Sequence, residues 1–176
     1  MDIEQLKYPI GKFKVPKEIT TEIINEWIGE IEALPERLEK AVDGLSDEQL
    51  DTPYRPNGWT VRQVVHHIAD SHINSITRFK LGMTENNPTI KPYAEGEWAK
   101  LADSKLPIEP SMQILKGLHH RLGILLRSMT EEDLEKTFFH PESQKSFSLK
   151  VNVGVYAWHS NHHLGHITSL KERKGW

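Results

Sequence analysis

Four of the ten histidines of this chain lie within eight residues, in the segment HSNHHLGH at 159–166. Neutral imidazole is a common metal ligand, but a histidine can also be buried with both ring nitrogens hydrogen-bonded and take no part in chemistry. His159 and His163 are four residues apart, so on a helix they lie one turn apart on the same face and can reach one ion. Such a pair needs a third ligand before it indicates a metal site.

Two other segments offer a third ligand, HHIADSH at 66–72 and HH at 119–120. On a helical wheel, His66 and His67 lie on opposite flanks of one apolar face, so the periodicity does not choose between them. His67 is followed three residues later by Asp70, which begins a polar stripe able to orient a ligand, whereas His66 lacks such a stripe.

The remaining marked residues favour structural roles. His72 lies within the apolar face of the same helix and is predicted to pack in the core. Of the pair His119 and His120, one is predicted to pack and the other to be half-exposed. His140 is expected in a loop. Trp59 is expected to anchor the start of a helix rather than to bind a substrate.

Four segments have the apolar periodicity of long amphipathic helices. They are residues 21–42, with Pro35 able to kink the helix, 60–83, 110–129, and a last helix capped by Asn152 and ending near Gly175. Short helical turns are expected at 46–50 and near 95–103, and an irregular or hairpin-like connection between 130 and 152. The pattern predicts an all-α fold, a four-helix bundle with short extra helices and one irregular connection.

The wheel of the last helix places His159, His163 and His166 on its apolar stripe, while Trp158 and Gly165 lie off that stripe. Three buried imidazoles cost desolvation free energy unless each finds a partner, and one shared cation would satisfy two of them. The alternative is a set of hydrogen-bonded core histidines with no metal.

Composition narrows the class of protein. A chain of 176 residues with 37% hydrophobic content is expected to form one domain over 1–176. A net charge of −3 without a run of Lys or Arg disfavours nucleic acid as a partner. The sequence shows neither a signal-peptide pattern nor a long apolar stretch, so we expect a cytoplasmic protein with no membrane contact. The absence of cysteine leaves His, Asp, Glu or water as metal ligands.

Several segments together resemble one family: YPIGKFKVP, LDTPYRPNGWTVRQVVHHIADSH, RFKLGMTENNPTIKPY and YAWHSNHHLGHIT. They are similar to the YfiT branch of the DinB-like superfamily, whose members are named metal-dependent hydrolases and, in part, bacillithiol S-transferases. The resemblance spans nearly the whole chain. It implies a DinB-like order of helices, a homodimer, and a divalent metal bound by His67, with Asp70 beside it, together with His159 and His163.

Three protein ligands leave coordination positions open, which is typical of a catalytic site. Three functions fit: transfer of a low-molecular-weight thiol, similar to bacillithiol, to an electrophilic small molecule; hydrolysis by a metal-bound water; or a non-catalytic, metal-stabilised binding bundle. Zinc is the working choice of metal, with nickel, iron and manganese as alternatives.

Overall fold

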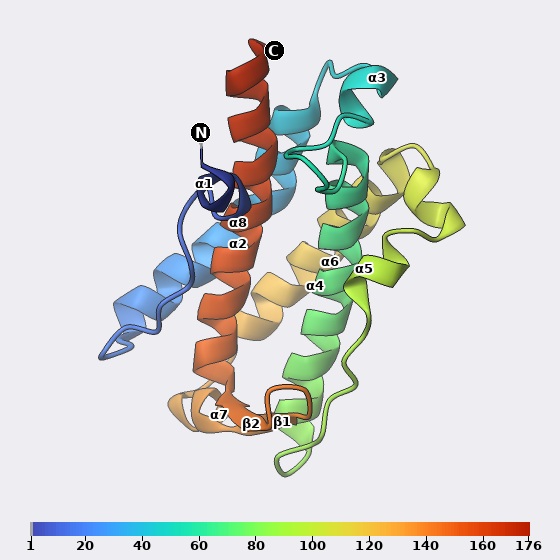
Figure 1. Cartoon of the computed structure of the whole chain (residues 1–176). Helices are drawn as coiled ribbons and strands as arrows, with labels where there is room; N and C mark the ends of the chain where they lie inside the picture. Colours follow the sequence, from blue (N-terminus) through green and yellow to red (C-terminus); the bar gives the residue numbers. More distant parts are fainter. Residues whose placement is uncertain (1) are drawn as a thin grey trace.

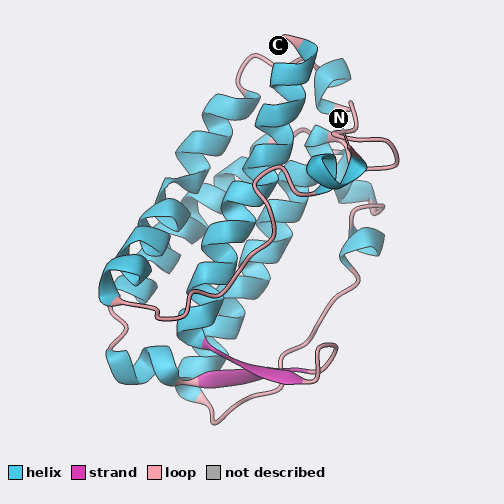
Figure 2. Cartoon of the chain, turned by 60° about the vertical axis from the view of Figure 1, so that its left-hand side comes forward, coloured by secondary structure: helices cyan, strands magenta, loops and turns pink. Residues whose placement is uncertain are grey.

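The computed structural model describes residues 2–176 and confirms the predicted four-helix bundle (Figure 1). The four long helices are α2 (Thr21–Val42), α4 (Val61–Thr84), α6 (Glu109–Arg127) and α8 (Leu149–Lys174). The short elements are α1 (Ile3–Lys7), α3 (Asp47–Leu50), α5 (Glu95–Trp98), the 3₁₀ helix η1 (Ala102–Lys105), α7 (Glu131–Glu135), β1 (Thr137–His140) and β2 (Lys145–Ser148). The expected irregular connection is α7 followed by an antiparallel β1–β2 hairpin (Figure 2). Within residues 2–176, every helix is too short or too polar to cross a membrane.

Side chains at the first turns explain where the helices begin. Thr60 accepts a hydrogen bond from the backbone N–H of Gln63, and the Gln63 side chain accepts one from the backbone N–H of Thr60. This is the capping box that a Thr followed three residues later by a Gln predicts. Pro35 lies inside an unbroken α2. Gly175 adopts a left-handed φ of 69° just after α8, where residues with a Cβ are strained.

The start of the last helix differs from the prediction. Ser148, at the end of β2, caps α8 by accepting from the backbone N–H of Val151, so the helix begins before Asn152. The serine hydroxyl satisfies an N–H group of the first turn and leaves no such role for Asn152. Asn152 is instead buried within α8, with only 4% of its surface exposed.

The direction of the helices follows from the long connection at residues 85–108. This connection, green to yellow in Figure 1, runs back along the bundle, so α4 and α6 run in the same direction. Helix α2 packs against α6 and α8, and α4 packs against the same two helices. Early residues of α2 meet early residues of α8 in one apolar cluster, so these two helices are also parallel.

The apolar core is divided into two clusters. One contains Leu34, Val65, Leu115 and Leu164, and the other contains Ile31, Phe79, Leu122 and Tyr156, among further members. Along α6 and α8 the histidines lie between these clusters. In α6, His119 lies between Leu115 of the first cluster and Leu122 of the second. In α8, the histidines at 159–163 lie between Tyr156 of the second cluster and Leu164 of the first. The bundle therefore contains a polar layer of histidines between two apolar layers.

The N-terminal segment covers the outer face of α8. Trp158 donates a hydrogen bond from its indole nitrogen to the Gly11 carbonyl, at 3.0 Å. Gly165 lies so close to Pro9 and Ile10 that a Cβ would approach their side chains to 3.2 and 3.3 Å. Off the predicted apolar stripe, Gly165 is thus buried and Trp158 partly buried, because another part of the chain packs on them.

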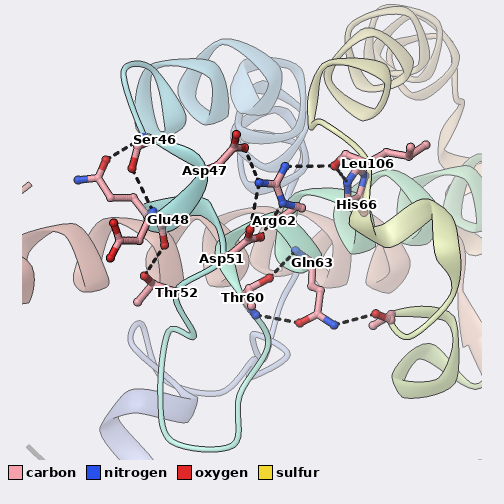
Figure 3. A network of polar contacts seen from close by, with 12 residues as sticks. Ser46, Asp47, Glu48, Asp51, Thr52, Thr60, Arg62, Gln63, His66 and Leu106 are labelled. Carbon is pink, nitrogen blue, oxygen red and sulfur yellow. Dashed lines mark hydrogen bonds and ion pairs between the residues drawn. The ribbon is translucent and has the colours of Figure 1, made fainter.

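A charged network fixes the start of α4 (Figure 3). Arg62 is buried and donates to the carboxylates of Asp47 and Asp51, at 2.7 and 2.6 Å, and to the Leu106 carbonyl at 3.2 Å. These bonds join α3 and the connection before α6 to the first turn of α4. The network thus ties the start of α4 to its neighbours about one turn before His66 and His67.

Candidate metal centre

Three histidines from two helices converge in the middle of the bundle. One nitrogen from each of His67, His159 and His163 can be chosen so that all three lie within 4.8 Å of one another. The Nε2 atoms of His67 and His159 are 3.3 Å apart. Two nitrogens bound to one ion at about 2.0–2.1 Å each have a similar separation, so the pair fits a shared transition metal.

The structure decides between the adjacent histidines of α4. His66 points toward the start of α6, where its Nδ1 lies 2.7 Å from the Ser111 hydroxyl. Its Nε2 lies 3.0 Å from the carbonyl of Leu106, just before that helix (Figure 3). Both of its ring nitrogens are therefore satisfied by the fold. His67 lies on the other flank of α4 and faces α8, because successive residues of a helix are about 100° apart.

His72 does more than pack, contrary to the prediction. Its Nε2 lies 3.2 Å from Nδ1 of His159, and the ring is fully buried. A metal on Nε2 of His159 would leave the ring proton on Nδ1, which would then donate to His72. A partner of this kind fixes the tautomer and the orientation of a metal ligand.

His119 supports His72 from the opposite side. The two rings stack with centroids 4.8 Å apart and an angle of 20° between their planes. Nδ1 of His119 donates to the Ile31 carbonyl at 2.6 Å, which ties the ring to α2. His119 is buried and His120 is exposed, so the pair divides into a packing and a surface residue much as the sequence suggested.

The predicted role of Asp70 has no support in the geometry. Its carboxylate forms no hydrogen bond with His67 or with any other residue in the described range, and only its backbone carbonyl accepts a bond, from Asn74. Burial raises the pKa of Asp70, and nearby Asp103 raises it further while His66 lowers it. Its charged neighbours thus lie on the His66 side of α4, because a residue three positions after His67 is rotated by about 60° around the helix.

A cavity of about 450 Å³ opens at the three histidines. Its wall includes the 54–59 turn, α1 and α8, and it carries the basic side chains of Lys7 and Arg55 opposite Glu95. Trp59 lines this cavity, and its ring centroid lies 4.6 Å from that of His67. The tryptophan is therefore part of the site as well as an anchor against the core, a role that its position beside a helix cap did not reveal.

Two further histidines border the same cavity. His162 and His166 lie one turn apart on α8, with their Nε2 atoms 3.1 Å apart, and His166 stacks on Tyr54 with centroids 3.9 Å apart. On the helical wheel, His166 lies on the apolar stripe and His162 at its edge. Both are buried, because α1 and the 54–59 turn cover this side of α8.

Burial keeps the candidate ligands neutral. It lowers the pKa of His67 to about 4, with a smaller contribution from the charge of His162. Burial and the neighbouring imidazoles also hold the pKa values of His159 and His163 well below the ordinary range. Neutral imidazole is the form that binds a metal, so the donors are ready at neutral pH. Nδ1 of His163 is a buried nitrogen without a hydrogen-bond partner among residues 2–176.

The family of the chain follows from its sequence as well as its fold. The model of the DinB superfamily matches residues 30–167, so the chain belongs to this superfamily. Proteins named "Putative metal-dependent hydrolase" from Bacillus cereus and Bacillus mycoides are 57% and 58% identical to it over 174 residues, which is 99% of this chain and 100% of each relative. A protein of the same name from Oceanobacillus iheyensis is 58% identical over 97% of this chain and 98% of its own length.

Solved structures agree with this assignment. YfiT from Bacillus subtilis, described as a probable metal-dependent hydrolase with an unusual four-helix bundle topology, superimposes with a TM-score of 0.95 at 47% identity, over 98% of this chain and 99% of that one. A mycothiol-dependent maleylpyruvate isomerase has a TM-score of 0.64 at 14% identity, over 80% of this chain and 59% of its own. The second likeness shows a shared fold.

Replacing any one of His67, His159 and His163 by alanine is expected to abolish stoichiometric metal binding, because two imidazoles leave the ion with too few protein ligands. Metal content of protein purified without an affinity tag, measured by mass spectrometry, tests this. His66→Ala is the matched control and should retain the metal. Full occupancy in His67→Ala would show that the ligands lie elsewhere.

His72→Leu is expected to weaken metal binding by about 10- to 100-fold, because His159 loses the acceptor that orients its ring. His72→Gln should restore much of the affinity, since its amide oxygen can accept near the position of Nε2. Competition with a chromogenic chelator measures both constants. Equal affinities for the leucine variant and the parent would reduce His72 to packing.

The metal-free protein is expected to lose stability as the pH falls from about 6.5 toward 4. The pKa values of His67 and His119 are lowered from 6.5 to about 4 by burial, so below pH 6.5 the unfolded chain binds protons that the folded chain does not. This stabilisation is complete above pH 6.5. Thermal unfolding midpoints measured between pH 8 and 4 test this expectation. His120→Gln, which changes an exposed histidine, is the control and should show the same dependence of the midpoint on pH. A midpoint that does not change between pH 6.5 and 4 would contradict the expectation.

Proposed function

We propose that this protein is a metal-dependent enzyme that transfers a low-molecular-weight thiol to an electrophilic organic substrate, at a site formed by His67, His159 and His163. The reaction joins the thiol sulfur to an electrophilic carbon. The leaving group departs with the electron pair of its bond, and the thiol proton passes to solvent or to the leaving group.

The observation that carries this proposal is that two cavities meet at one of the candidate metal-binding histidines, His159. Besides the cavity of about 450 Å³, a second cavity of about 320 Å³ lies between α4, α8 and the β1–β2 hairpin. His159 and Glu95 line both. A transfer reaction needs two organic reactants next to each other, whereas hydrolysis needs one reactant and water. Two spaces of small-molecule size that meet at His159 suit the first requirement.

A bound divalent ion would supply a Lewis acid that lowers the pKa of a coordinated thiol or water toward neutrality. The protein's own side chains do the rest. His72 orients His159, and Trp59 excludes water from one side of His67. His162 and His166, kept neutral by burial, which lowers their pKa values to about 4 and 3, add uncharged rings to the wall of the larger cavity.

The chain contains no cysteine, so it has no thiol of its own to act as nucleophile. A thiol used at this site must come from solution. Lys7 and Arg55 give the larger cavity a basic wall, which suits a thiol that carries negative groups.

Hydrolysis is the second candidate, and it is favoured by the names of the relatives at 57–58% identity. The same three histidines would serve it, with water in place of the thiol. A non-catalytic bundle is less well supported, because two cavities open at the histidine cluster. Zinc as the metal, the cytoplasmic location and the homodimer remain predictions.

The two reactions are separated by their dependence on thiol. With the metal-loaded protein, bacillithiol and chlorodinitrobenzene, we expect conjugation near neutral pH that disappears after metal removal and in His67→Ala, because the thiol is no longer deprotonated. Release of dinitrophenyl thioether is followed by absorbance, and His120→Ala is the control that should keep the full rate. Thiol-independent, metal-dependent turnover of nitrophenyl acetate, without conjugation, would support hydrolysis and contradict transfer.

A further inference from the structure

The second cavity contains an arginine that has no counter-ion. Arg78, on α4, is half-buried and lines the cavity of about 320 Å³. It forms neither an ion pair nor a hydrogen bond with any residue in the range 2–176, and its Nε is buried without a partner. Arg62 and Arg127 contrast with it, because each donates to carboxylates. A cation withdrawn from water without a partner is costly unless a ligand supplies the missing anion.

Two more polar groups without partners line the same cavity. Asn152 is 4% exposed, and its amide nitrogen has no hydrogen-bond acceptor in the described part of the chain. Nδ1 of His140, at the end of β1, is likewise buried and unpaired. The predicted loop position of this histidine is wrong, because the hairpin places it in a strand facing α4. Donors from α4, α8 and the hairpin thus converge on one space.

The cavity is continuous with the candidate metal centre. Asn152 precedes His159 by seven residues, so both lie on one side of α8, two turns apart. His159 itself lines the cavity. The pKa of His159 is lowered by burial, then by the charges of His67 and His162, and also by the charge of Arg78. The last of these effects is consistent with a guanidinium group that faces this ligand.

Most of the rest of the wall is aromatic, aliphatic or acidic, with Ser71 as a further polar residue. Phe138 and Phe147, with ring centroids 6.1 Å apart, form an aromatic side together with Tyr156. Glu95 and Glu142 also line the cavity and are exposed to solvent, so they lie toward its mouth. Their negative charge disfavours a doubly charged ligand, whereas a single carboxylate on an apolar body can pair with Arg78 and leave its body against the aromatic rings.

We infer that this cavity binds the carboxylate of an organic substrate. The guanidinium group of Arg78 pairs with the carboxylate, and the side-chain amide of Asn152 is a second hydrogen-bond donor. The apolar part of the substrate packs against the aromatic side. The reactive atom of such a substrate then lies toward His159. The inference rests on the proposed function for the identity of the cavity as a substrate site, but binding of the carboxylate does not require turnover.

Phenylacetate is the probe, because it carries one carboxylate on an aromatic body and its size suits a cavity of about 320 Å³. Its dissociation constant is measured by calorimetry or ligand-observed NMR on the full chain, both metal-loaded and metal-stripped. Phenylacetamide, which has the same shape without the charge, and phenyl phosphate, with a second negative charge, are the matched ligands.

Arg78→Gln is expected to weaken phenylacetate binding by about 10- to 100-fold, because a charge-assisted pair is lost. Arg78→Lys should recover part of the loss, since the charge remains without the fork. Arg121→Gln removes an exposed arginine of α6 and should change nothing. Circular dichroism and the thermal midpoint of each variant show whether the fold is kept.

The inference is supported if the unaltered protein binds phenylacetate more tightly than phenylacetamide and phenyl phosphate. The weaker binding of phenylacetate by Arg78→Gln should appear in both the metal-loaded and the metal-stripped protein. Equal binding of acid and amide overturns it without the need for any variant. Binding that is insensitive to Arg78 and vanishes with the metal also overturns it, because the metal would then hold the carboxylate. None of these results depends on catalysis, so an absence of thiol transfer would contradict the proposed function alone.

Discussion

The structure depends on the cost of burying imidazole rings between four helices. Charged histidines are excluded from such a place, and the lowered pKa values of His67 and His119, about 4 each, express this exclusion. Neutral rings still need partners for their nitrogens. The bundle meets part of this need with contacts that run from His159 to His72 and, through stacking on His119, to the backbone of α2. Other buried ring nitrogens, Nδ1 of His163 among them, have no partner among residues 2–176. The apolar clusters on either side hold this layer in place.

The same layer explains how a stable bundle can carry a reactive centre. A continuous apolar core would pack more tightly but would leave no donors, whereas an open polar cavity would admit water to every ring. Here His67, His159 and His163 lie at the boundary between core and cavity. His159 contacts His72 through its Nδ1 and lines both cavities, whereas His67 and His163 line the larger cavity. Support from within the bundle and access from a cavity thus meet at His159.

Segments outside the four long helices determine the chemistry of these spaces. The 54–59 turn brings Arg55 and Trp59 to the larger cavity, and the β1–β2 hairpin brings His140 to the smaller one. Membership of the DinB superfamily and the likeness to YfiT agree with the bundle. Different connections between the same helices can therefore offer different substrates to a similar centre.

The sequence alone determined the four long helices, the capping box at Thr60 and the inward direction of His159 and His163, because these depend on local periodicity and neighbouring residues. Resemblance to a family, and not periodicity, selected His67 over His66. Only the tertiary structure showed that His66 is satisfied by Ser111 and the Leu106 carbonyl, and that His72 contacts a candidate ligand. It also showed that the carboxylate of Asp70 makes no hydrogen bond to His67, and it brought Arg78, Asn152 and His140 to one cavity. These relations join residues far apart in the chain, and their geometry depends on how helices rotate and pack against one another, which a one-dimensional pattern does not encode.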